Sequence, residues 1–210
     1  MTGKFRIALS KGRLFAPSID LLAKAGIRIS EDGSRRLLFS DDEKMFEFIA
    51  LKPIDIPVYV ESGAIHAGIV GSDIVRELES DVYEPLDLQI GKCKLSLAAP
   101  NDTHLSLDGH PRIATKYPRT AERFFKSRNA HVQIVTLEGS VEIAPLLGLA
   151  DGIIDLVETG RTLRDNGMRI IEDISRVSAK LIVNRTAMKI KATDAGQLIS
   201  HLDAVVYATN

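Results

Sequence analysis

The sequence predicts an α/β fold in which largely parallel strands alternate with helices. Short apolar runs that suit buried strands alternate with segments whose apolar residues recur at helical spacing, and this alternation starts again after Arg112. The composition agrees, because 210 residues with 45% hydrophobic and 26% charged residues can bury one or two cores and are too apolar for a disordered chain. We therefore expect two α/β units.

The chain opens with a strand followed by a helix. Phe5 to Leu9 is a short apolar run typical of a buried strand, and Pro17 to Ala25 carries apolar residues at helical spacing until Gly26 ends the helix. Arg36 to Phe39 and Phe46 to Leu51 are predicted to pair as a hairpin. The acidic residues between these two strands are expected to form a solvated turn.

A helix, a strand, a second helix and another strand follow. Pro53 suits the first turn of a helix that runs from Ile54 to Glu61. Ala67 to Val70 resembles a buried strand, and Gly71-Ser72-Asp73 begins a helix with a capping residue. Leu86 to Ile90 is predicted as a further strand. The alternation favours a parallel sheet because a helix is the usual crossover between parallel strands.

A second unit follows Gly91-Lys92, which we interpret as the crossing between the two. The same strand and helix signals recur there and continue to the C-terminal region. Strands are predicted at Lys94 to Ala99, Ile113 to Thr115, Val132 to Leu137, Ile153 to Val157, Arg169 to Ile174 and Lys180 to Val183, and helices at Thr120 to Ser127, Val141 to Leu147, from about Thr162, and Ala195 to Tyr207.

The bulk properties exclude several classes of function. With 27 basic against 28 acidic residues the net charge is −1, so no chain-wide field favours nucleic acid or an anionic membrane. No stretch approaches the roughly 18 to 20 apolar residues that cross a bilayer, and the first residues do not resemble a secretory signal. The single cysteine, Cys93, fits a reducing compartment, so a cytoplasmic location is expected.

Several catalytic motifs are missing from the sequence. The five histidines are scattered without metal-ligand spacing, and no GxSxG, HExxH, Walker A or GxGxxG element occurs. A hydrolase, a zinc enzyme, a P-loop enzyme and a dinucleotide dehydrogenase therefore lose support. Cys93 has no CxxC partner, and a buried inert thiol is the simpler interpretation of it.

The stretch "DLVETGRTL", Asp155 to Leu163, carries the strongest signal for a ligand. It follows an apolar run, so it lies where a strand ends and a helix begins, and its glycine permits a left-handed turn. Its hydroxyls and arginine suit a phosphate, and its acids suit ribose hydroxyls or a hydrated metal ion. A plain strand-to-helix turn with a threonine cap remains the alternative. The residues concerned are Asp155, Glu158, Thr159, Gly160, Arg161 and Thr162.

Two basic stretches suggest further contacts with phosphate. "LSKGRL" places Lys11 and Arg13 on either side of Gly12 at a second strand-to-helix turn, the position where open α/β sheets bind ligands. "GSRRLLF" contains Arg35 and Arg36, of which only one can face a given cleft if the segment is extended. Solvated surface charges are the alternative for both stretches.

Weaker candidates lie at other strand ends. "RIATKYP" ends a strand with Lys116 and Tyr117, a cation and an aromatic ring that could meet a nucleotide base. Gly71-Ser72-Asp73 and Glu138-Gly139-Ser140 resemble helix N-termini, which are more often caps than binding sites, and the same applies to Glu142.

Taken together, these stretches resemble one family closely, the ATP phosphoribosyltransferases, which catalyse the first step of histidine biosynthesis. The resemblance extends over nearly the whole chain, in the order of the family. Its matching stretches are "ALSKGRL" (Ala8 to Leu14), "GIVGSDIV" (Gly68 to Val75), "RIATKYPRTAERFF" (Arg112 to Phe125) and the long "GSVEIAPLLGLADGIIDLVETGRTLRDNGM" (Gly139 to Met168).

The resemblance implies a two-lobed fold like the type II periplasmic binding proteins, with the active site in the cleft between domains. Domain I would take residues 1–90 with 179–210, and domain II residues 91–178 with the loop that binds phosphoribosyl pyrophosphate (PRPP). Since the sequence ends soon after its last helix, it resembles the short form of the family. Short forms imply a homodimer bound to a regulatory subunit that resembles histidyl-tRNA synthetase.

The implied reaction is attack of adenine N1 of ATP on C1 of PRPP, which gives phosphoribosyl-ATP and releases pyrophosphate. Charge neutralisation would fall to two arginines, with Mg²⁺ held mainly by the substrate phosphates rather than by protein ligands. Thr159 to Thr162 would cradle the 5′-phosphate of PRPP. The implied catalytic residues are Arg13 and Arg35; the PRPP residues are Asp155, Glu158, Thr159, Gly160, Arg161 and Thr162; the ATP residues are Lys11, Gly12, Asp73, Cys93, Lys116, Tyr117 and Glu142.

The acidic pair departs from the adjacent pair of other phosphoribosyltransferases. Asp155 and Glu158 are three positions apart, so on a strand they face opposite sides, and both reach one ligand only if the turn begins by Glu158. The competing class is a non-enzymatic solute-binding or sensor module for a phosphorylated ligand, because the same two-lobed architecture serves such proteins.

Overall fold

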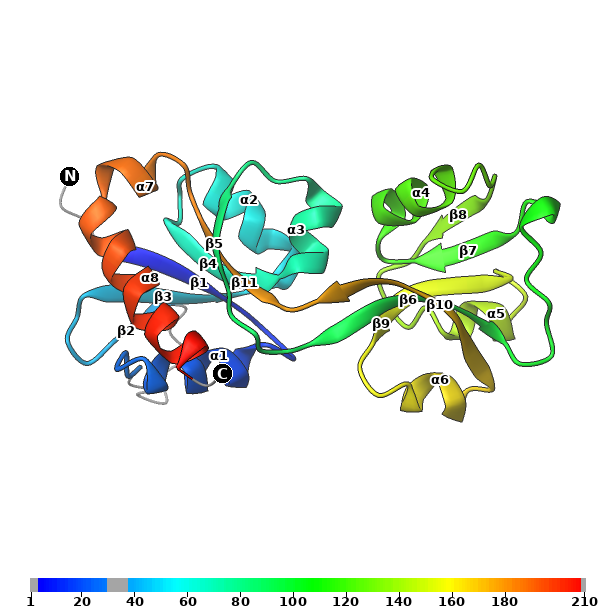
Figure 1. Cartoon of the computed structure of the whole chain (residues 1–210), viewed down its shortest axis with the longest axis horizontal. Coiled ribbons are helices and arrows are strands. Elements are labelled where there is room, and N and C mark those ends of the chain that lie inside the picture. Colours follow the sequence, from blue (N-terminus) through cyan, green and yellow to red (C-terminus); the bar gives the residue numbers. More distant parts are fainter. Residues whose placement is uncertain (1–3, 30–37, 209–210) are drawn as a thin grey trace. The chain divides into compact units, whose positions relative to one another are not determined.

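The computed structural model describes residues 4–29 and 38–208. The chain divides into two compact units, unit 1 with Met1–Gly91 and Ser178–Asn210, and unit 2 with Lys92–Val177 (Figure 1). The catalytic candidate Arg35 lies outside the described residues. No helix in the described part of the chain is long and apolar enough to cross a lipid bilayer.

Unit 1 is built on a sheet of six strands, counted over the described residues. Its strand order is β2-β3-β1-β4-β11-β5, and helices cover both faces (Figure 1). The strands are β1 (Phe5–Ser10), β2 (Leu38–Ser40), β3 (Phe46–Leu51), β4 (Ala67–Gly71), β5 (Tyr83–Asp87) and β11 (Ala179–Val183), and the helices are α1 (Phe15–Lys24), α2 (Ile56–Glu61, after a 3₁₀ turn at Pro53–Asp55), α3 (Ser72–Leu78), α7 (Ala187–Ile190) and α8 (Ala192–Tyr207).

The alternation of side chains along each strand gives unit 1 two apolar clusters. Ile7 and Leu9 of β1 belong to the cluster packed against α1 and α8, whereas Ala8 between them belongs to the cluster packed against α2 and α3. Leu181 and Ile182 of β11 divide in the same way. Strands that are buried on both faces have to be apolar at successive positions, which explains the unbroken apolar runs in the sequence.

The expectation of a largely parallel sheet needs correction, because the sheet is mixed. β1 pairs in parallel with β3 and β4, but β11 pairs antiparallel with β4 and with β5. The chain re-enters unit 1 from unit 2 at Ser178, just before β11. Because no helical crossover links β4 to β11, β11 could pair with β4 in either the parallel or the antiparallel direction. The predicted hairpin of β2 and β3 is antiparallel as expected.

The turn between β2 and β3 differs from the fully solvated turn that its acidic residues suggest. Asp42 and Glu43 are exposed, but Asp41 is buried. One carboxylate oxygen of Asp41 accepts a hydrogen bond of 2.7 Å from the backbone N–H of Phe46, and Asp41 forms a β-bridge with Ile29. Asp41 therefore fixes the start of β3 rather than solvating the turn.

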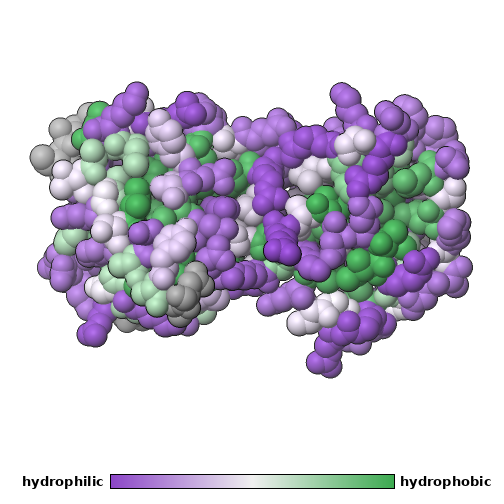
Figure 2. Space-filling model, viewed as in Figure 1, coloured by the Kyte–Doolittle hydropathy of each residue, from purple (hydrophilic) through white to green (hydrophobic). Residues whose placement is uncertain are grey.

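Unit 2 contains a second mixed sheet, of five strands over the described residues, in the order β10-β6-β9-β7-β8. An apolar cluster joins the sheet to the segment around α5 and α6. The strands are β6 (Cys93–Pro100), β7 (Arg112–Thr115), β8 (Gln133–Thr136), β9 (Gly152–Val157) and β10 (Met168–Val177), and the helices are α4 (Pro118–Lys126), α5 (Ile143–Leu146) and α6 (Arg161–Asp165). Figure 2 shows hydrophilic side chains over most of the viewed face, with hydrophobic patches between them.

A buried asparagine fixes the return of the chain into unit 1. The side-chain amide of Asn184 donates to the carbonyl oxygens of Val60 and Glu61 at 2.8 and 3.1 Å, and so satisfies the last turn of α2. Its side-chain oxygen accepts from the backbone N–H groups of Thr186 and Ala187 at 3.0 and 2.9 Å, where α7 begins. One side chain thus joins α2, β11 and α7.

We expect Asn184→Ala to lower the free energy of unfolding by about 2–4 kcal/mol. The substitution leaves buried carbonyl and N–H groups without partners, and each such group costs about 1–3 kcal/mol. Urea unfolding followed by circular dichroism measures the change. Asn101→Ala, at an exposed position, is the control and should stay within about 0.5 kcal/mol of the parent. Equal stability of the two variants would contradict this role of Asn184.

Candidate active site

Three parallel strand ends of unit 2 meet at one edge of its sheet. β7 pairs in parallel with β8 and with β9, and Thr115 lies opposite Thr136 on one side and Ile154 on the other. The segments after these strands therefore leave from the same edge, which is where open α/β sheets bind ligands. β6 is antiparallel to β9, so it begins at this edge, with Lys94 opposite Val157.

The buried Thr115 fixes the end of β7. Its hydroxyl donates to the carbonyl oxygen of Ile154 at 2.7 Å and accepts from the backbone N–H of Tyr117 at 2.9 Å. The turn that carries Lys116 is therefore held to β9 on one side and to the start of α4 on the other. Thr115 was not among the predicted site residues, although its place at the end of a predicted strand was the available signal.

A hollow of about 390 Å³ opens at this edge and collects several of the predicted residues. The turn after β7, the segment between β8 and α5, strand β9 and helix α6 all contribute to it. Its lining residues are Lys116, Glu138, Gly139, Ser140, Glu142, Ile153, Asp155, Leu156, Thr162 and Leu163. The structure thus brings Lys116, Glu142, Asp155 and Thr162 together. Glu138 to Ser140, whose sequence resembles a helix N-terminus, also line the hollow.

Asp155 is a partly buried charge in the hollow, with a side chain that is 20% exposed. Burial removes water from the carboxyl group and raises its pKa above the ordinary value, and the nearby Glu142 adds to the rise. Lys116 opposes the rise, with its ammonium nitrogen 3.6 Å from a carboxylate oxygen of Asp155, and so does the backbone N–H of Leu156 at 2.8 Å. A carboxylate in this state gains from any ligand that donates hydroxyl hydrogens to it.

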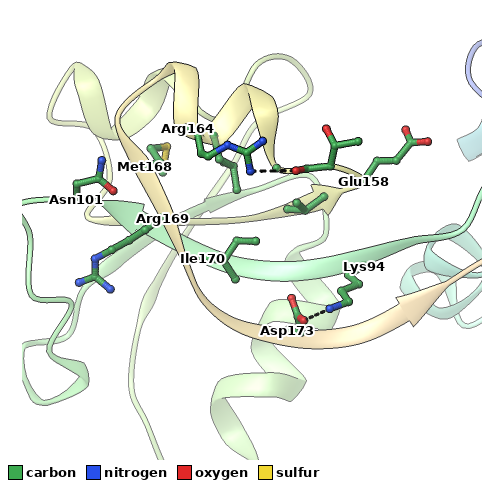
Figure 3. Close-up of a pocket in the computed structure, with 12 residues that line it drawn as sticks. Lys94, Asn101, Glu158, Arg164, Met168, Arg169, Ile170 and Asp173 are labelled. Atoms are coloured by element: carbon green, nitrogen blue, oxygen red, sulfur yellow. Dashed lines mark hydrogen bonds and ion pairs between the residues drawn. The ribbon is translucent and has the colours of Figure 1, made fainter.

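Glu158 lines a different pocket from Asp155. This second pocket has a volume of about 500 Å³ and lies between the start of α6 and β10 (Figure 3). Its lining residues are Lys94, Asn101, Val157, Glu158, Thr159, Gly160, Leu163, Arg164, Met168, Arg169, Ile170 and Asp173. β9 ends at Val157, and Glu158 follows it in the loop that lines the second pocket, so the two acids face different spaces.

The loop between β9 and α6 has a defined internal structure. Gly160 adopts a left-handed conformation with φ of 70°, which only glycine takes without strain. The hydroxyl oxygen of Thr159 accepts from the backbone N–H of Arg161 at 3.4 Å. The guanidinium of Arg161 pairs with Asp165 one turn later at 3.4 Å, and its side chain is 83% exposed. Thr162 faces the first hollow, whereas Thr159 and Gly160 line the second pocket.

Two predicted ATP residues of unit 2 are packed inside it. Tyr117 precedes α4 and is only 5% exposed, so its ring contributes to the core in this structure. Cys93 begins β6 and is 8% exposed. The interpretation of Cys93 as a buried thiol is consistent with this burial.

The candidates of unit 1 lie at the ends of two of its parallel strands. Lys11 follows β1, and its backbone N–H donates to the carbonyl oxygen of Leu51 at 2.8 Å. Gly12 has a φ of +81° with open space around it, and Arg13 donates from its guanidinium to the carbonyl oxygen of Gly91 at 2.7 Å. Asp73 is buried in the first turn of α3 after β4.

The fold and the polar strand ends define a class, the two-unit α/β proteins that also include periplasmic binding proteins. The substrate-binding protein of an amino acid ABC transporter aligns with a TM-score of 0.60 over 98% of this chain and 92% of that protein, at 15% identity. Such a likeness shows the fold alone, and it agrees with the predicted fold class.

The particular family follows from the sequence comparisons. The family model described as ATP phosphoribosyltransferase matches residues 52–204. The ATP phosphoribosyltransferase of Oceanobacillus iheyensis is 48% identical over 202 residues, which cover 95% of this chain and 97% of that one. That of Listeria monocytogenes is 46% identical over 203 residues, which cover 96% and 95%. The chain therefore belongs to the ATP phosphoribosyltransferase family, and it is a pentosyltransferase of histidine biosynthesis.

A solved structure supports the same assignment. The ATP phosphoribosyl transferase (HisG:HisZ) complex from Thermotoga maritima aligns with a TM-score of 0.85 and 29% identity, over 97% of this chain and 99% of that chain. The alternative of a non-enzymatic binding or sensor module is not favoured, because the binding proteins share the fold at much lower sequence identity.

We expect Lys116→Met to raise the pKa of Asp155 further, because Lys116 is the main group that lowers it. The carboxyl carbon of Asp155, followed by ¹³C NMR during a pH titration, measures the shift. Lys94→Met is a matched control, because the ammonium of Lys94 pairs with Asp173 and not with Asp155. If both variants titrate as the parent does, the ion pair has no influence on Asp155.

Proposed function

We propose that the hollow at the end of β9 binds the ribose and 5′-phosphate of PRPP, and that the chain transfers the phosphoribosyl group to N1 of ATP. The observation that carries this proposal is the convergence of Asp155, Lys116, Glu142 and Thr162 on one hollow at the edge of a parallel sheet. A ligand with hydroxyls at one end and phosphate at the other suits a partly buried carboxylate next to hydroxyl and cationic groups.

In this proposal Asp155 accepts hydrogen bonds from the ribose hydroxyls. Burial makes its charge costly, and hydroxyl donors reduce that cost, so the binding of the sugar and the ionisation of Asp155 favour each other. The loop from Thr159 to Thr162 surrounds the 5′-phosphate with hydroxyl and backbone donors, and Arg161, whose side chain is exposed, adds charge. Glu158 has a weaker claim on the ribose because it lines the second pocket.

The reaction requires alignment more than proton transfer. Adenine N1 already has a lone pair, so the site needs no strong base, and the barrier falls when charge on the departing pyrophosphate is neutralised and the reactants are aligned. We assign this neutralisation to Arg13 and Arg35. Lys11, Gly12, Asp73, Cys93, Lys116, Tyr117 and Glu142 are proposed to form the ATP site.

Among the described residues no group of three or more histidine, cysteine or acidic side chains could hold a metal ion by itself. We propose that Mg²⁺ is held mainly by the substrate phosphates, whose oxygens are the ligands that hard cations prefer. Its chemistry would be to neutralise phosphate charge as the pyrophosphate leaves.

We also propose that the chain works as a homodimer with a regulatory subunit that resembles histidyl-tRNA synthetase. The support for the partner subunit is the alignment, nearly end to end, with a chain of the HisG:HisZ complex from Thermotoga maritima. A cytoplasmic location is proposed as well, which agrees with the single cysteine in the sequence.

The direct test is to mix the purified protein, with and without its regulatory subunit, with ATP, PRPP and Mg²⁺. We expect release of pyrophosphate together with a change in adenine absorbance, because N1 substitution alters the chromophore. Replacing ATP by GTP is the control and should abolish both signals. A silent assay with the regulatory subunit present would refute the proposal.

Asp155→Asn should lower kcat/KM for PRPP by about 10²-fold, since hydrogen bonds to a charged group contribute about 1.5–3 kcal/mol each. Glu158→Gln is the matched variant, because its acid lies three residues away but in the other pocket, and it should lose less than about fivefold. Steady-state kinetics with PRPP varied at saturating ATP measures both. A larger loss in Glu158→Gln than in Asp155→Asn would reverse the assignment of the ribose site.

A further inference from the structure

Arg164 braces the loop between β9 and α6 from the side of the second pocket. Its guanidinium donates from Nη1 to the carbonyl oxygen of Thr159 at 3.1 Å (Figure 3), and its backbone N–H donates to the carbonyl oxygen of Gly160, also at 3.1 Å. Both carbonyls of the Thr159-Gly160 turn are thus bound by one residue on α6.

The neighbouring basic residues of this pocket have other partners. The ammonium of Lys94 pairs with Asp173. The guanidinium of Arg169 donates to the carbonyl oxygen of Thr103 at 3.0 Å. Among the described basic residues that line the pocket, Arg164 is therefore the one whose side chain holds the loop.

This contact fixes the orientation of one peptide group. The described residues contain no cis peptide bond, and the N–H and C=O of a trans peptide point in opposite directions. When Arg164 binds the Thr159 carbonyl toward the second pocket, the Gly160 N–H is turned away from that pocket. Space around Gly160 is also tight, because a Cβ there would lie 3.1 Å from Nη1 of Arg164.

We infer that Arg164 is a positioning residue for PRPP. It lines the second pocket and is not among the residues that line the proposed sugar-phosphate hollow. It holds the Thr159-Gly160 peptide in the orientation in which the loop receives the 5′-phosphate, so the loop does not have to be ordered when PRPP binds. This inference rests on the proposed function. It predicts an effect on the binding of the 5′-phosphate and little effect on the chemical step.

The test compares Arg164→Met with Arg169→Met, which removes the other arginine of the same pocket. We expect Arg164→Met to raise KM for PRPP about tenfold, with kcat within about twofold and KM for ATP unchanged, as for the loss of one charge-assisted hydrogen bond. Arg169→Met should leave all three constants unchanged. Arg164→Lys, which keeps a donor, should recover part of the loss.

Two inhibitors separate positioning from general damage to the fold. Ribose 5-phosphate carries the 5′-phosphate, so its inhibition constant should rise about tenfold in Arg164→Met, in parallel with KM for PRPP. The inhibition constant of pyrophosphate, which lacks that group, should not change. If Arg164→Met does not fold, Arg164→Lys alone is measured and should show the same selective rise to a smaller extent.

The outcomes distinguish the inference from the function on which it rests. Equal PRPP constants in Arg164→Met and Arg169→Met would overturn the inference, and so would an equal rise in the constants for PRPP, ATP and pyrophosphate. A parent protein that is inactive with ATP, PRPP and Mg²⁺ would overturn the proposed function instead.

Discussion

The parallel pairing of β7 with β8 and β9 is the constraint on which the candidate site depends. Because the three strands run in the same direction, residues far apart in the sequence, such as Lys116, Glu142 and Asp155, leave the sheet at one edge. The hydroxyl of Thr115 maintains this arrangement through its bond to the Ile154 carbonyl. A shift of one residue in β9 would turn Asp155 to the other face of the sheet, and the hollow would lose the carboxylate that pairs with Lys116.

The "DLVETGRTL" stretch is also divided between two pockets. Asp155 and Thr162 face the first hollow, and Glu158, Thr159 and Gly160 line the second pocket. A loop that borders two pockets can be bound by a ligand on one side and braced on the other. Rigidity and recognition then come from different residues, which explains how a short α6 with few contacts of its own can present a defined surface.

The sequence predicted most elements because their signals are local. β4 is buried at all of its positions and reads as a continuous apolar run, and Pro53 and Gly26 mark helix boundaries by their backbone properties alone. The errors have non-local or competing causes. β5 ends at Asp87 rather than Ile90, because Gln89 adopts a left-handed conformation that breaks the strand although Leu88 remains buried. The direction of β11 depends on pairing with strands more than ninety residues away, which no local pattern records.

The same distinction between local and non-local information applies to the site. That polar residues gather at strand ends follows from topology, and so the candidates of "DLVETGRTL" and "RIATKYP" could be found without coordinates. Which acid lines which pocket depends on where β9 ends and the loop begins. The contacts of Arg164 depend on the left-handed conformation of Gly160, which turns the chain into α6. Sequence spacing therefore identifies the residues that contact a ligand more readily than the residues that position the binding loop. Positioning depends on contacts to the backbone, which have no characteristic motif.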